Sequence, residues 1–275
     1  MATLKRIFHP TDLSAASETA FFHALKLAVC GRSSLTLMHV TEPHGNVHRE
    51  DFPSIRATLE QWGAIAPGSE IDAVEELGVS VRKVVSHRKD PVEACQHYLE
   101  SHAAGLVVLA VHQYAGVMRW LHHSVSVPIV QNAGEKALLL PHGVQGFVAA
   151  EDGRVSLRNI LLPVAHNLRP QAAADAAHVL ITQLGLTAGT VTLLHVGEAG
   201  NAPAIQPPAD TQWEWRQLVR QGNVVETILQ TADEINADLL IMPTEGRNGF
   251  FDALRGSTTE RVLQRIACPL LTVPA

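Results

Sequence analysis

The stretches SLTLMHV (Ser34–Val40) and TVTLLHV (Thr190–Val196) lie far apart in the chain, yet they follow the same pattern. Each alternates apolar residues with threonine or serine and closes with His-Val. Short runs of this kind predict buried β-strands. Because the pattern occurs twice, the sequence predicts that one structural unit is repeated.

Three further pairs of segments match and keep the same order in both halves. An internal duplication therefore explains the sequence better than coincidence does. The pairs are LKRIFHP (Leu4–Pro10) with LRNILLP (Leu157–Pro163), AAGLVVLA (Ala103–Ala110) with NADLLIMP (Asn236–Pro243), and ALLLP (Ala137–Pro141) with LLTVP (Leu270–Pro274).

Each copy alternates short apolar runs with segments of helical period, which is typical of βαβ units on a parallel sheet. The runs GLVVLAV and DLLIMP suit strands that helices cover on both faces. We therefore predict an α/β fold with two five-stranded parallel sheets. The predicted strands are Leu4–Pro10, Leu35–Val40, Val79–Val85, Leu106–Val111 and Ala137–Leu140, then Asn159–Pro163, Val191–Val196, Glu214–Val219, Leu239–Met242 and Leu270–Val273.

The helices are expected between these strands. Ser14 is the predicted N-cap of the first one, in which Ala20, Ala24 and Leu27 recur at helical spacing. The other predicted helices are Ser54–Trp62, Pro91–Ser101, Gln171–Leu184, Val224–Ile235 and Thr258–Ile266, and residues 197–210 are predicted to form a loop.

The repeat predicts domains at residues 1–142 and 157–275. The linker, residues 143–156, contains glycines and a D-G turn, and its GFVAA stretch could add a short hairpin or edge strand. A length of 275 residues also favours two domains.

Composition favours an ordinary globular protein and argues against several functions. Apolar residues make up 46% of the chain, charged residues 17%, and the net charge is −6 without a dense basic stretch, so nucleic acid is not expected as a partner. No apolar run reaches membrane-spanning length, and three distant cysteines suit a reducing compartment, so a cytoplasmic protein is expected. The histidine pairs lack metal-ligand spacing, so no metal site is predicted.

A glycine-containing loop follows the strand DLLIMP. Nine residues separate Gly246 from Gly256, and Ser257 and Thr258 then open a predicted helix. Backbone N–H groups at a helix start can receive an anion, and glycine lets the backbone approach it closely. The same turn can equally be an ordinary helix cap that binds nothing.

This loop resembles that of ATP-binding universal stress proteins, which read G-x2-G-x9-G-[ST]. The resemblance implies a Rossmann-like, adenine nucleotide alpha hydrolase-like fold, domains that pair through their last strands, and binding of ATP or a related adenine nucleotide. Pro243 replaces the family's first glycine, Glu245 replaces a histidine, and Ala165 replaces the aspartate that contacts adenine, although His166 could substitute. The nucleotide-binding residues implied are Pro163, Val164, Ala165, Val196, Met242, Pro243, Glu245, Gly246, Arg247, Gly256, Ser257, Thr258 and Thr259.

The first copy shows the opposite loss. It keeps Asp12 at the adenine position, where the residue can also serve as a turn or cap, but Ala110, Gln113 and His123 replace the three glycines, and Trp120 adds bulk. This site is interpreted as vestigial, with residues Thr11, Asp12, Val40, Ala110, Gln113 and Ser124.

The resemblance favours a stress-response protein whose second domain binds nucleotide, with Mg²⁺ as an optional companion, and so regulates an unknown protein partner. Self-association as a homodimer is also expected. One alternative is a scaffold in which both sites are degenerate. Another is a slow ATPase or nucleotidyl transferase, for which only Glu245 offers a base or metal ligand, since no GxSxG, Walker or HExxH motif is present.

Overall fold

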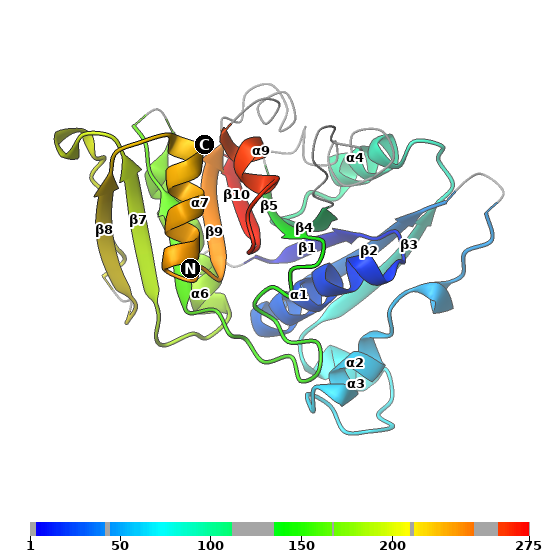
Figure 1. Ribbon diagram of the computed structural model, residues 1–275. Coiled ribbons are helices and arrows are strands. Elements are labelled where there is room, and N and C mark those ends of the chain that lie inside the picture. Colours follow the sequence, from blue (N-terminus) through cyan, green and yellow to red (C-terminus); the bar gives the residue numbers. More distant parts are fainter. Residues whose placement is uncertain are drawn as a thin grey trace.

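The ten strands in the described part of the chain join one continuous sheet (Figure 1). This computed structural model describes residues 4–41, 45–111, 135–166, 168–209, 212–244 and 258–274. The strand order is β3-β2-β1-β4-β5-β10-β9-β6-β7-β8, so the second half repeats the order of the first in mirror sequence. The predicted repeat of a five-stranded parallel unit is therefore confirmed, and the two units join in a single sheet.

Every predicted strand is present, and each boundary lies within two residues of its expected position. Pairing is parallel within each half, whereas β5 and β10 pair antiparallel, with Leu138 opposite Leu271. The expected pairing through the last strands is thus confirmed within one chain. The strands are β1 Arg6–Pro10, β2 Ser34–Val40, β3 Ser80–Ser86, β4 Leu106–Val111, β5 Lys136–Pro141, β6 Asn159–Pro163, β7 Thr190–Val196, β8 Glu214–Arg220, β9 Leu239–Thr244 and β10 Leu270–Pro274.

The helices also follow the sequence pattern, with two differences. The five-residue α3 was not predicted, and Ser14 occupies the N-cap of α1 without making a side-chain cap bond, because its hydroxyl donates to Asp12 Oδ1 at 2.6 Å. The described helices are α1 Ala15–Gly31, α2 Ile55–Gln61, α3 Asp72–Glu76, α4 Pro91–Ser101, α6 Pro170–Gln183, α7 Val224–Glu234 and α9 Thr258–Leu263, with short 3₁₀ turns η1 Arg49–Asp51 and η3 Ala199–Asn201.

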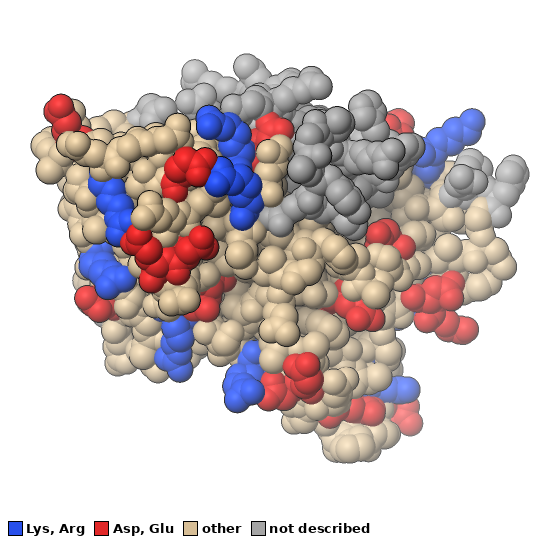
Figure 2. Space-filling model, in the orientation of Figure 1, with Lys and Arg blue, Asp and Glu red and all other residues tan. Residues whose placement is uncertain are grey.

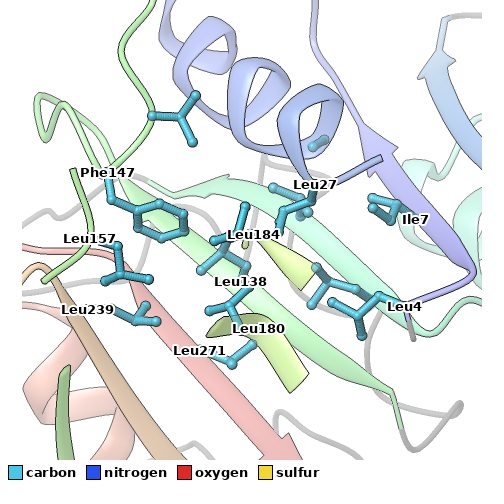
Figure 3. Close-up of a cluster of buried hydrophobic side chains, with 14 of the residues drawn as sticks. Leu4, Ile7, Leu27, Leu138, Phe147, Leu157, Leu180, Leu184, Leu239 and Leu271 are labelled. Atoms are coloured by element: carbon cyan, nitrogen blue, oxygen red, sulfur yellow. The ribbon is translucent and has the colours of Figure 1, made fainter. Parts of the chain in front are cut away.

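Helices cover both faces of the sheet. Helices α1 and α6 pack on one face, in a core that runs through both halves, and α4, α7 and α9 pack on the other. Figure 3 shows Leu27 and Leu138 of the first half close to Leu180 and Leu271 of the second. The junction between the halves is therefore hydrophobic core rather than a polar seam.

One buried glutamine also joins the two halves. Gln183 of α6 accepts a hydrogen bond from the Leu4 N–H at 2.9 Å and donates to the Leu27 carbonyl at 2.9 Å. Gly31 leaves room for it, because a Cβ at that position would lie 2.2 Å from Gln183 Nε2. Both polar ends of this amide are thus satisfied by backbone of the first half, which aligns α6 with α1 and β1.

The segment predicted as the linker packs closely against the first half. Phe147 is fully buried, and Val148 and Val155 form an isolated antiparallel bridge, as the hairpin prediction expected. His23 Nδ1 lies 2.7 Å from the Thr19 carbonyl, while its Nε2 accepts N–H bonds from Phe147 and Val148. The linker therefore belongs to the folded core.

Candidate functional site

The second half contains a topological switch point, a position in the strand order at which α/β proteins usually bind ligands. Strand β6 lies between β7 and β9, so the chain leaves β6 toward one side and later returns on the other. The β6–β9 ladder holds only the pairs Ile160–Leu239 and Leu161–Leu240, although both strands continue further. The strands thus separate toward their carboxyl ends, which is the usual place for a ligand in this architecture.

This separation explains how a proline is tolerated in a central strand. Pro243 pairs with Val273 of β10 in the ladder register, while the Leu240 N–H donates to the Pro269 carbonyl on the β10 side. Alternation along a strand then directs the Pro243 nitrogen toward β6. The ladder with β6 has already ended there, so the missing N–H breaks no sheet hydrogen bond.

The described residues among those predicted to bind nucleotide lie mostly at the ends of three neighbouring strands. Pro163, Val164 and Ala165 end β6 or follow it, Val196 ends β7, and Met242 and Pro243 lie near the end of β9. Thr258 and Thr259 begin α9, and His166 is exposed. The remaining predicted residues, Glu245, Gly246, Arg247, Gly256 and Ser257, lie outside the described residues.

The histidine repeated in SLTLMHV and TVTLLHV has the same contact in both halves. His39 Nδ1 lies 2.9 Å from the Thr11 carbonyl, and His195 Nδ1 lies 3.3 Å from the Val164 carbonyl. Each histidine therefore holds the backbone just beyond the neighbouring strand, at the edge where α/β proteins usually bind ligands. The backbone gives this turn a second link, because Thr11 N–H and Val164 N–H bond across to Met38 and Leu194.

His195 leaves one polar atom toward this edge. Its side chain is buried and its Nε2 has no hydrogen-bond partner among the described residues. Gly197, with φ of +155°, passes so close that a Cβ there would lie 2.9 Å from this nitrogen. The role of this histidine was not predicted from the sequence, and its repetition in SLTLMHV and TVTLLHV was the signal that could have revealed it.

In the first half, the predicted residues Thr11 and Asp12 form a closed turn. The Asp12 carboxylate accepts hydrogen bonds from the Ser14 backbone and hydroxyl, while Leu13 has φ of 63°. Partial burial opposes ionisation of Asp12, but the hydrogen bonds from Ser14 outweigh it and lower its pKa. These contacts support the turn role of Asp12. Val40 and Ala110 lie at the ends of β2 and β4, and Gln113, His123, Trp120 and Ser124 lie outside the described residues.

His9 crosses the corresponding gap in the first half. The β1–β4 ladder also holds two pairs, the last being Phe8–Val107, and just beyond it His9 Nδ1 lies 2.9 Å from the Val108 carbonyl. Burial lowers the pKa of His9 to about 4, so the ring is neutral and Nδ1–H donates. The second half has the apolar Leu162 at the matching position. The sequence did not predict this polar bridge, because His9-Pro10 and Leu162-Pro163 are equally compatible with the end of a strand.

Two findings concern other functions. Within the described ranges, no group of three His, Cys, Asp or Glu side chains is placed to hold a metal ion, and no helix is long and apolar enough to cross a membrane. Figure 2 shows acidic and basic side chains interspersed over the visible face, without a broad basic surface.

Comparisons with known proteins indicate the same protein family. The model of the "Universal stress protein family" matches residues 3–141 and 214–274. A 55-residue segment, 20% of this chain, is 44% identical to the universal stress protein E homolog of Haemophilus influenzae, and a 59-residue segment, 22% of this chain, is 37% identical to a universal stress protein of Synechocystis. These segments span 18% and 38% of the two relatives.

The fold is shared over almost the whole chain. The crystal structure of a universal stress protein from Archaeoglobus fulgidus superposes with a TM-score of 0.62 at 17% identity, and the match covers 99% of this chain and 97% of that one. At this identity the likeness concerns the fold.

Proposed function

Because the chain belongs to the universal stress protein family, we propose that it is a stress-response protein whose second half alone binds an adenine nucleotide. Nucleotide occupancy would then alter a surface that a protein partner recognises. The nucleotide would lie over the carboxyl ends of β9, β6 and β7, with its phosphates on the loop that contains Gly246, Gly256 and Ser257.

One observation carries the choice between the halves. In both halves the first strand separates from its neighbour after two ladder pairs, but His9 bonds across the gap in the first half, whereas Leu162 offers no such bond in the second. The glycines required for close approach to phosphate also occur only in the second loop. Geometry and sequence therefore favour the same half.

Paired substitutions at the third glycine position test this assignment. Gly256→Val should weaken ATP binding by at least about tenfold, since a β-branched side chain keeps the backbone from the phosphates. His123→Val, at the matching position of the first loop, should leave the affinity unchanged. Isothermal titration of both variants is the measurement, and loss of binding in the His123 variant alone would assign the site to the wrong half.

Glu245 is expected to weaken nucleotide binding by repulsion. Two like charges about 4 Å apart cost about 1 kcal/mol in water and several in a drier site, unless a divalent cation bridges them. Binding should therefore depend on Mg²⁺, and Glu245→His should tighten it and reduce that dependence. Titrations with and without Mg²⁺ measure this. Phosphate release by the wild type, abolished in the same variant, would instead support the ATPase alternative.

A scaffold without nucleotide is the second candidate. The closed turn at Asp12 and the His9 bridge occupy the carboxyl edge of the first half, and the continuous sheet joins this half to the second. Chromatography of the denatured protein distinguishes the candidates: co-purified adenine nucleotide supports the proposed function, and its absence together with no ATP binding at millimolar concentration supports the scaffold.

A further inference from the structure

A cavity of about 550 Å³ lies beside the outer strand of the first half. The edge strand β3 forms one wall, and α2, α3 and η1 form the others. Cavities of roughly 300–1,000 Å³ are the usual size for small-molecule sites. This one is lined by the early part of β3, so it is separate from the carboxyl edge of the second half, where the nucleotide is proposed to bind.

Positive charge collects around the cavity although the whole chain carries a net charge of −6. Arg49, Arg56, Arg82 and Lys83 line it, against the single carboxylate of Glu75. Only Arg56 has an ion-pair partner within the described ranges, Glu60, at 3.8 Å and with more than half of the arginine side chain exposed. Three cationic side chains therefore lack a carboxylate counterpart.

Lys83 shows that this charge is not simply a solvated surface feature. Its ammonium donates to the Arg49 carbonyl at 3.2 Å and lies 5.8 Å from the centre of the Phe52 ring. Burial lowers the pKa of Lys83, because part of its hydration is lost without a compensating negative charge. An anion placed in the cavity would supply that charge.

The rest of the lining is apolar. Ile55, Val74 and Val79 are buried beneath it, and Ile71 at its margin has 70% of its surface exposed. Only one other large hydrophobic residue of the described part, Val224, is exposed. A ligand with an apolar body would cover Ile71 and remove this surface from water.

The described part of the second half has no counterpart of helices α2 and α3. Its β7–β8 connection contains only the short turn η3 in the described residues, whereas the β2–β3 connection of the first half contains α2 and α3. The cavity is therefore a feature that distinguishes the two copies. The half that has lost the phosphate-loop glycines is the one that holds it.

We propose that the cavity between β3, α2 and α3 binds a small amphipathic anion, with a carboxylate or phosphate head near Arg49 and Lys83 and an apolar body against Ile71 and Val74. Arginine and lysine donate charge-assisted hydrogen bonds to either head group. The apolar body distinguishes this ligand from a free inorganic anion.

Four probes separate the contributions of charge and apolar body. Octanoate and octyl phosphate carry both features, octanol carries only the apolar chain, and inorganic phosphate only the charge. We expect the two amphipathic anions to bind at least about tenfold more tightly than octanol or phosphate, because only they satisfy both surfaces. The tighter of the two identifies the preferred head group. Titration followed by NMR of backbone amides places the site.

Substitutions on the full-length protein provide the controls. Arg49→Gln, at an exposed position that lines the cavity, should weaken binding of the anions about five- to tenfold and leave octanol unchanged. Ile71→Ser should weaken binding of all three eight-carbon probes. Arg88→Gln removes an exposed arginine outside the cavity and should change nothing. Equal binding of octanol and octanoate, equal effects of the Arg49 and Arg88 changes, or no binding at millimolar concentration would each overturn the proposal.

Discussion

Replacing Phe147 by alanine is expected to lower the free energy of unfolding by about 3–5 kcal/mol, although this residue lies in the segment between the two predicted domains. The ring is fully buried and meets the His23 ring edge-on, with 4.5 Å between the ring centres. Its removal leaves a cavity in the core that spans both halves. Urea unfolding followed by tryptophan fluorescence measures the loss.

Gln145→Ala is the matched control, because this side chain is exposed and lies two positions earlier in the same segment. Its effect should stay within about 0.5 kcal/mol. If the segment were only a tether, both variants would behave alike and the two halves would unfold in separate steps. A single transition in the wild type, shifted as a whole by Phe147→Ala, is the expected result.

The fold was predictable because its signals are local. Apolar runs indicate strands such as Leu106–Val111, and periodicity together with capping residues within a few positions indicates helices such as Pro91–Ser101. Asp90, for example, accepts N–H bonds from Val92 and Glu93 at the start of α4. Helix α3 escaped prediction because five residues cover little more than one turn and show no period.

Long-range polar contacts were not predictable in the same way. Nothing near Gln183 in the sequence indicates that its amide bonds to Leu4 and Leu27, which lie more than 150 residues away. Likewise, His23 and the Phe147 backbone meet only after folding. For the candidate site, the strand ends followed from the repeat, whereas the His9 bridge depends on how far β1 and β4 separate, which no local pattern records.

Acid is expected to destabilise the protein through two buried histidines. Burial lowers the pKa of both His9 and His23 to about 4, from 6.5 in the unfolded chain. As pH falls from about 6.5 to about 4, these histidines therefore bind protons in the unfolded state but stay neutral in the folded state. The contribution of these two histidines to the free energy of unfolding is complete above about pH 6.5, decreases as pH falls to about 4, and is constant below that. Each histidine accounts for about 3 kcal/mol of the decrease.

Buried Glu135 works in the opposite direction. Burial raises its pKa to about 7, against 4.5 for an ordinary glutamate, so the folded state binds this proton more readily and gains stability as pH falls between these values. One glutamate offsets roughly one histidine. The expected net loss between pH 7 and pH 4 is therefore about 3 kcal/mol, a large part of the roughly 5–15 kcal/mol that holds a typical protein folded.

Three substitutions separate these contributions in urea unfolding at pH 7.5, 5.5 and 4.5. His9→Leu copies the matching Leu162 of the second half and should reduce the acid loss by about 3 kcal/mol. Glu135→Gln should steepen the loss, since it removes the offset. His87→Gln, at an exposed position, should leave the profile unchanged. An acid loss that His9→Leu leaves as steep as in the wild type would show that burial does not lower the pKa of His9 in solution.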